Sequence, residues 1–120
     1  EELKIAIGSD VAGGHSIAIY KQIARAVQLS KLKEFYEPDQ SKTITLTQAF
    51  YHATKEAGSV FGKVGSFEKE YQFNALVIDT MEDSWVPLTA EERLERFCYI
   101  GDDRNIKARF IDGKEIHFEN

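Results

Sequence analysis

The sequence has 120 residues, and 42% of them are hydrophobic, including eight phenylalanines and five tyrosines. A chain of this size and composition can bury a core of its own, which excludes a disordered tail. Its formal net charge of −5, from 15 basic and 20 acidic residues without a basic cluster, gives no electrostatic footprint for a phosphate backbone. We therefore expect no nucleic-acid partner.

The first predicted element is a β-strand over residues 4–8. Lys4-Ile5-Ala6-Ile7-Gly8 is a short apolar run without room for a helix, which is typical of a buried strand that ends at Gly8. This strand would place Asp10 just past its C-terminal end. No parallel strand partner is predicted in the first 60 residues, although a buried strand cannot satisfy its own backbone.

Two helices are predicted to follow the glycine break at residues 13–14. The first should run from about Ser16 to about Lys33 and stop before Pro38. Its apolar face is formed by Ile17, Tyr20, Ile23, Ala24 and Val27. Residues 37–43 are polar and predict a flexible loop. Thr45 and Gln48 then match a capping box, which predicts a second helix that ends near residue 58.

The second half of the chain predicts strands and one short helix. The run at residues 75–78, Ala-Leu-Val-Ile, is typical of a buried strand. Thr89 with Glu92 matches another capping box and predicts a short helix near residues 90–99 that stops at Gly101, with one face formed by Leu94, Phe97 and Cys98. Asp112-Gly113 accepts the positive φ values of a type I′ turn. We expect a terminal hairpin with alternating apolar residues at Ile106, Ala108, Phe110, Ile116 and Phe118.

Asp10 is the main candidate for chemistry. It lies within Gly8-Ser9-Asp10-Val11-Ala12-Gly13-Gly14, where a carboxylate at a strand tip is followed by glycines that allow a tight turn and leave space for a ligand. Catalytic residues of β/α barrels sit at such strand tips. The pattern alone leaves a second interpretation open, in which Asp10 caps the following helix or satisfies a turn. Ser9 is not expected to be a nucleophile, because the Gly-x-Ser-x-Gly elbow is absent.

The histidines show no metal-ligand spacing among themselves, so His52 and His117 are interpreted as ordinary surface or helix residues. His15 follows Gly14 and could line the same pocket as Asp10. The cytidine-type zinc deaminase signature is missing, which excludes that class. Asp102-Asp103 before Arg104 is interpreted as a solvated turn.

Cys98 is the only cysteine, and its place on an apolar helix face favours a packed small hydrophobe. A single cysteine excludes an internal disulfide and fits a reducing compartment, so we expect a cytoplasmic chain. The N-terminus lacks a signal-peptide pattern, and no apolar run approaches the roughly 20 residues of a membrane span. We therefore expect no membrane association.

Two tracts resemble the guanine deaminase branch of the amidohydrolase superfamily, and a third resembles the amidohydrolases in general. Residues 8–14 resemble the segment that closes the barrel in this branch, and Tyr99-Ile100-Gly101-Asp102-Asp103-Arg104-Asn105-Ile106 resembles its characteristic C-terminal tract. Between them, residues 62–68 leading to residues 75–79 resemble the stretch that re-enters the small β-domain. Where the wider superfamily has an Ala-Asp pair, this chain has Asn74-Ala75, which agrees with the guanine deaminase branch.

The resemblance implies hydrolytic deamination of guanine to xanthine and ammonia on a (β/α)8 barrel with one zinc ion. In that scheme the metal lowers the pKa of a bound water, and Asp10, by its position, binds the metal and takes the proton. The fold class implied is α/β. Residues 1–62 would form the last strand and following helices of the barrel, and residues 63–120 the C-terminal part of a small β-sandwich domain.

The family's other zinc ligands, which include a His-x-His pair, and its proton-shuttling glutamate map to no residue of this sequence. We therefore expect a fragment of a longer enzyme that is inactive alone, and a homodimer for the complete enzyme. Two alternatives stay open. One is another amidohydrolase-superfamily deaminase or chlorohydrolase, and the other is a non-catalytic α/β interaction module. The isolated piece could also associate through its unpaired strand edge.

Overall fold

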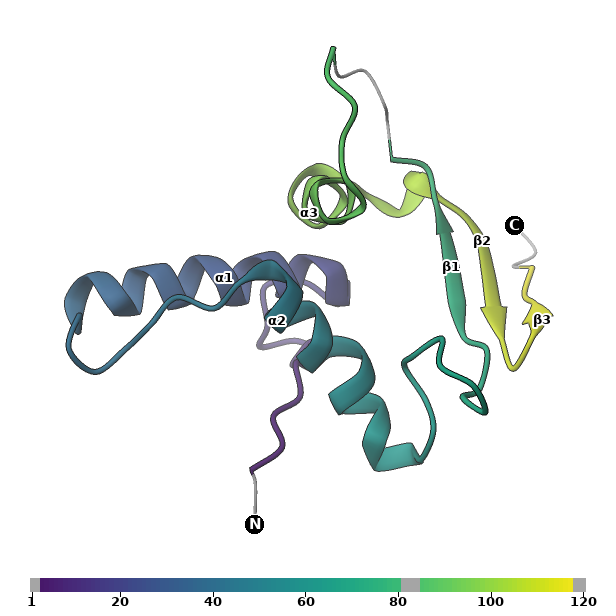
Figure 1. The fold of residues 1–120 in the computed structure, drawn as a ribbon, viewed down its shortest axis with the longest axis horizontal. Helices are drawn as coiled ribbons and strands as arrows, with labels where there is room; N and C mark the ends of the chain where they lie inside the picture. Colours follow the sequence, from purple (N-terminus) through teal and green to yellow (C-terminus); the bar gives the residue numbers. More distant parts are fainter. Residues whose placement is uncertain (1–2, 81–84, 118–120) are drawn as a thin grey trace. The chain divides into compact units, whose positions relative to one another are not determined.

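The computed structural model describes residues 3–80 and 85–117, and it divides the chain into two compact units, Glu1–Ala57 and Gly58–Asn120. The first unit contains the helices α1 (Ile19–Tyr36) and α2 (Leu46–Tyr51) and the π-helical turn η1 (His52–Glu56). The second contains η2 (Ser59–Phe61), β1 (Ala75–Ile78), α3 (Ala90–Ile100), η3 (Asp103–Asn105), β2 (Ile106–Ile111) and β3 (Lys114–Glu115) (Figure 1). In the described residues, no helix is long and apolar enough to cross a membrane.

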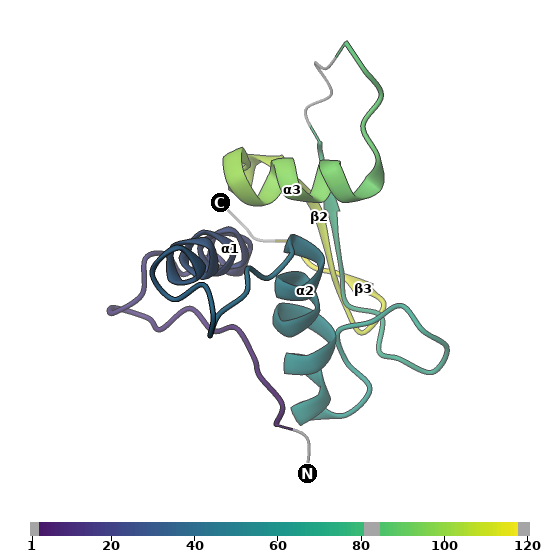
Figure 2. The ribbon, with the colours of Figure 1, turned by 60° about the vertical axis from the view of Figure 1, so that its left-hand side comes forward.

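The core of the first unit lies between α1 and α2, which cross rather than run parallel (Figures 1 and 2). The buried side chains are Ile23, Ala24 and Val27 of α1 and Leu46 and Ala49 of α2. The α1 residues belong to the predicted apolar face, with the i, i+3, i+4 spacing that keeps one side of a helix in contact with its neighbour.

Helix α1 begins three residues later than predicted. The Ser16 hydroxyl accepts a hydrogen bond from the Ala18 amide at 3.1 Å, and the Gln22 side chain donates to the Ser16 carbonyl. Ser16 therefore organises the turn before the helix, and Ile17 lies outside α1 and is exposed. The helix ends at Tyr36, ahead of Pro38 as predicted, because a proline disfavours helical backbone in the residue before it.

The loop after α1 and the second capping signal agree with the sequence. Residues 37–45 contain no helix or strand, and the Thr43 amide donates to the Glu34 carboxylate at 3.0 Å. The Thr45 hydroxyl then accepts from the Gln48 amide at 3.1 Å, while the Gln48 side chain accepts from the Thr45 amide at 2.9 Å. This capping box starts α2. The predicted uniform helix to residue 58 is interrupted, because the chain widens into the π turn η1.

The strand predicted over residues 4–8 is not present in the structure. A strand needs a hydrogen-bonded neighbour, and the described parts of the chain provide none for this segment. The Ile7 amide instead donates to the His52 carbonyl at 3.3 Å. Ile5 is 54% exposed, so the segment is also not buried as predicted.

The second unit is built on an antiparallel sheet with the strand order β1-β2-β3. Ala75 pairs with Phe110 and Val77 with Ala108, and the register shifts after Val77. The turn between β2 and β3 has φ values of 50° at Asp112 and 74° at Gly113, which are the two positive values that a type I′ turn requires. The predicted hairpin is confirmed, although β3 has only two residues and Phe118 lies outside the described residues.

Two further features of this unit bear on the predictions. β1 was predicted to be buried, but Leu76 is 51% exposed and Val77 is 49% exposed, because none of the described elements of this unit covers both faces of so small a sheet. Helix α3 agrees with its capping signal, since the Glu92 amide donates to the Thr89 hydroxyl at 3.2 Å. Cys98 of α3 is fully buried, in agreement with its interpretation as a packed hydrophobe.

Candidate functional site

The candidate site is a tight turn around Asp10. The Asp10 carbonyl accepts hydrogen bonds from the amides of Gly13, at 2.9 Å, and Gly14, at 2.5 Å. Asp10 has a φ of 49° and Ala12 a φ of 74°, so two residues other than glycine adopt left-handed backbone conformations in this short stretch. Such backbone costs about 1–2 kcal/mol per residue and is found preferentially at functional sites.

The two glycines of the turn lie against neighbouring atoms of Ser9 and Asp10. A Cβ at Gly14 would lie 1.8 Å from the Ser9 carbonyl oxygen, and a Cβ at Gly13 would lie 2.7 Å from the Asp10 carboxylate oxygen Oδ2. Neither position has space for an alanine without rearrangement. Gly8, before the turn, would place a Cβ in open space. The tight turn that the sequence predicted at residues 13–14 is therefore observed.

The structure also shows whether Asp10 caps the helix that follows it, which was one part of the alternative interpretation. Helix α1 begins at Ile19 after Ala18, and no side chain caps its N-terminus. The Asp10 carboxylate therefore does not cap this helix. Its carbonyl closes the turn, and the residue itself is exposed to solvent.

The histidines are distributed over the chain. His15 is exposed and follows the glycine turn directly, whereas His117 lies 3.9 Å from the Glu115 carboxylate at the end of the hairpin. His52 lies in η1 and contacts Glu56. Within residues 3–80 and 85–117, no three His, Cys, Asp or Glu side chains form a group that could hold a metal ion. In this part of the chain Asp10 is thus not within a complete metal site.

The Asp102-Asp103 pair before Arg104 lies in a solvated turn, as predicted. The Asp102 side chain accepts from the Arg104 amide at 2.9 Å, and the Arg104 guanidinium contacts both oxygens of the same carboxylate, with its shortest contact at 2.6 Å. This carboxylate raises the pKa of Arg104. The Asn105 side chain accepts from the Asp102 amide at 2.9 Å, which completes a capping box for η3. The Arg104 side chain is 87% exposed.

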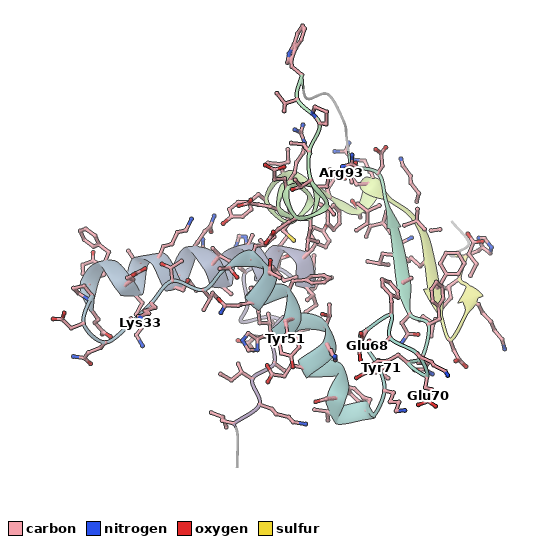
Figure 3. All side chains as sticks on the ribbon, viewed as in Figure 1. Lys33, Tyr51, Glu68, Glu70, Tyr71 and Arg93 are labelled. Carbon is pink, nitrogen blue, oxygen red and sulfur yellow. The ribbon has the colours of Figure 1, made fainter. Side chains whose placement is uncertain are left out.

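The loop that precedes β1 folds back on itself. The Lys63 carbonyl accepts from the Gln72 amide at 2.8 Å, and the Lys63 ammonium pairs with the Glu70 carboxylate. Glu68, Glu70 and Tyr71 of this loop are labelled in Figure 3, and the Tyr71 amide donates to the Glu68 carbonyl at 3.1 Å. Residues 63–72 of the resembling tract therefore form one closed loop that leads into β1.

Sequence reasoning missed the role of His52. Its ring nitrogen Nδ1 lies 3.2 Å from the Ile5 carbonyl oxygen, and its own carbonyl accepts from the Ile7 amide. His52 therefore contacts the segment that leads to Asp10. No spacing rule could have found this contact, because its partners are backbone atoms more than forty residues away in the sequence.

Comparison with known proteins assigns the chain to a family. The model of the amidohydrolase family matches residues 1–116. The chain belongs to the amidohydrolase family. A guanine deaminase of Homo sapiens is 34% identical to this amidohydrolase chain over 127 aligned residues, which cover 96% of the chain and 28% of the relative. The chain thus spans just over a quarter of the length of this relative.

Solved structures agree with this assignment. A guanine deaminase from C. acetobutylicum with guanine bound in its active site superposes with a TM-score of 0.86 at 46% identity, over 93% of this chain and 27% of that one. A guanine deaminase of E. coli superposes with a TM-score of 0.77 at 19% identity, over 98% of this chain and 28% of that one, which shows a shared fold. The amidohydrolase chain therefore has the fold of the matching part of these enzymes.

Proposed function

We propose that this chain forms part of a guanine deaminase, an enzyme that hydrolyses guanine to xanthine and ammonia. The observation that carries the proposal is the 46% identity, over 93% of the chain, to a guanine deaminase that binds guanine in its active site. The glycine turn around Asp10 supports it, because an exposed carboxylate on a tightly turned backbone is what such a hydrolysis needs from this part of the chain. In the proposal, the residues of this chain act together with residues outside it.

The donor chemistry of Asp10 fits a zinc ion, since carboxylate oxygens are among the ligands that zinc accepts in proteins. One carboxylate is not sufficient, because catalytic zinc sites use three protein ligands and an open position. The described residues contain no such group, so the remaining ligands in this proposal are supplied by other parts of the enzyme. Zinc would supply Lewis acidity, which makes water a nucleophile at neutral pH.

Asp10 has two tasks in this proposal. Its carboxylate would be one ligand of the zinc ion, and it would accept the proton that the attacking water loses. The water oxygen forms a bond to the guanine carbon that carries the amino group, and the bond from that carbon to nitrogen breaks. The nitrogen leaves as ammonia after it receives a proton, so guanine and water become xanthine and ammonia. The turn at residues 10–14 fixes the backbone of Asp10, from which the carboxylate extends.

The test of this proposal is Asp10→Asn in the enzyme that carries this chain. Asparagine has the same shape but cannot accept a proton, so turnover of guanine should fall at least 100-fold, which is the scale of a lost general base. Asp39→Asn, in the exposed loop after α1, is the matched control and should retain activity. Guanine turnover by the Asp10 variant within tenfold of the parent would refute the assignment. Turnover of cytosine or a triazine in place of guanine would favour the related amidohydrolases.

The domain assignment and the assembly belong to the same proposal. Residues 1–62 form the end of a (β/α)8 barrel, and residues 63–120 form part of a composite β-sandwich domain. The complete enzyme is a cytoplasmic homodimer, and this chain alone is inactive. Calorimetry should detect no stoichiometric zinc binding at micromolar affinity by this chain alone, because a stable site needs more ligands than Asp10.

A further inference from the structure

His52 contacts the segment before Asp10 in two ways. Its ring nitrogen Nδ1 lies 3.2 Å from the Ile5 carbonyl oxygen, and its backbone carbonyl accepts from the Ile7 amide at 3.3 Å. Side chain and backbone of one residue therefore fix two alternate positions of the same segment. Tyr51, which is labelled in Figure 3, is the last residue of α2 and directly precedes His52 in the sequence.

Glu56 orients the His52 ring. Its carboxylate also contacts Nδ1. The Glu56 side chain is 15% exposed, and the His52 side chain is 27% exposed. The Ile5 carbonyl and the Glu56 carboxylate are both acceptors, so Nδ1 must carry the proton that they share. The Tyr51 ring stands edge-on to the imidazole with a centroid separation of 5.8 Å. In this arrangement the Nδ1–H of His52 faces both the Ile5 carbonyl and the Glu56 carboxylate.

The helix changes from α-helical to π-helical geometry at this point. His52 and Glu56 are the first and last residues of the π turn η1, which interrupts an otherwise α-helical segment. Single π turns inside α-helices are rare and are frequently found at functional sites. The turn carries both contacts to the N-terminal segment, since they come from the carbonyl and the ring of its first residue.

We propose that His52, oriented by Glu56, is a positioning residue for Asp10, an inference that rests on the proposed function. Within the described parts of the chain, residues 4–8 form no strand, and Ile5 and Ile7 are held by these two contacts with His52. Ile7 lies only three residues before Asp10, where the glycine turn begins. His52 does not touch substrate. It acts through the backbone of Ile5 and Ile7, which sets where the Asp10 turn begins.

Two substitutions of His52 separate this role from simple packing. His52→Asn places an amide donor close to the position of Nδ1, whereas His52→Leu fills a similar volume and donates nothing. In the enzyme that carries this chain, His52→Leu should lower kcat about 10- to 100-fold, the scale expected when a catalytic group moves by about 1 Å. KM for guanine should change less than about threefold, since the contact does not involve substrate. His52→Asn should recover most of kcat.

The controls make the outcomes distinct. His117→Leu removes an exposed histidine at the hairpin end and should leave kcat unchanged. Hydrogen exchange over residues 3–10 should be faster in His52→Leu than in His52→Asn, and this measurement does not depend on activity. If the parent protein fails to deaminate guanine, the proposed function is wrong, and the exchange comparison still tests the contact. Equal kcat for the Leu variant and the parent, or equal losses in both variants with unchanged exchange, would overturn the positioning role.

Discussion

Alanine substitutions at three glycines should separate the geometry of the Asp10 turn from the general effect of replacing a glycine. At Gly14 the new Cβ would lie 1.8 Å from the Ser9 carbonyl oxygen and 3.0 Å from the Asp10 carbonyl oxygen. Both neighbours are backbone atoms, so no side-chain rotation can relieve the overlap and the turn must open. Opening it removes the hydrogen bonds from Gly13 and Gly14 to the Asp10 carbonyl. At about 0.5–1.5 kcal/mol each, their loss predicts a destabilisation of about 1–3 kcal/mol.

The neighbouring position should behave differently. At Gly13 the new Cβ would meet the Asp10 carboxylate at 2.7 Å, and a side chain can rotate away. We therefore expect Gly13→Ala to change the unfolding free energy by less than about 1 kcal/mol, within the usual range of small effects. The displaced carboxylate should nevertheless lower kcat about 10- to 100-fold, because small displacements of catalytic groups have effects of this size.

Gly8→Ala is the matched control, because its Cβ would meet nothing within 4 Å. The assay is denaturant unfolding and guanine turnover of the three variants in the enzyme that carries this chain. Gly14→Ala should be the least stable of the three variants. Gly8→Ala should have the highest kcat of the three. If Gly13→Ala turns over guanine as fast as Gly8→Ala, the position of the Asp10 carboxylate does not matter, and the argument is wrong.

The remaining predictions concern local features. Thr45→Ala should destabilise the first unit by about 1 kcal/mol in denaturant unfolding, because it removes the N-cap of α2. Hydrogen bonds from the Thr89 amide and hydroxyl lower the pKa of Glu92, so their contribution to stability is present above the ordinary glutamate pKa and lost as the pH falls through the lowered one. NMR titration of Thr89→Ala should show the Glu92 pKa closer to its ordinary value. Cys98 is fully buried, so a thiol reagent should label it only as fast as α3 opens. The isolated chain should associate in sedimentation experiments as its concentration rises, because Leu76 and Val77 are half exposed on β1.

Features determined by neighbouring residues could be predicted from the sequence. The capping boxes at Thr45 and Thr89 and the type I′ turn at Asp112-Gly113 are all present, because each depends on two to four consecutive residues. Their hydrogen bonds form within the local segment whatever surrounds it. The start of α1 was placed three residues too early, since Ser16 forms its hydrogen bond in the turn before the helix.

Features that depend on distant residues could not be predicted in the same way. The apolar pattern of residues 4–8 indicated a strand, but a strand forms only when a neighbour accepts and donates its hydrogen bonds. The burial expected for β1 failed for a related reason, since an apolar strand is buried only if other elements cover it. Twenty-one large hydrophobic residues of the described chain are at least a third exposed, against seven buried hydrophobic ones. An apolar pattern therefore indicates that a segment is suited to pack against other elements, but it does not show whether this chain contains those elements.

The candidate site combines both kinds of feature. The glycine turn at residues 10–14 is local, so the sequence could indicate both the turn and the carboxylate within it. The function of the carboxylate depends on residues outside the tract at residues 8–14. The interpretation of Asp10 as a metal ligand therefore came from the family resemblance and not from this tract alone. The His52 contact lies between these cases. Its partners are backbone atoms of Ile5 and Ile7, which carry no side-chain signature, so only a structure that brings η1 against this segment could identify His52 as a residue that positions Asp10.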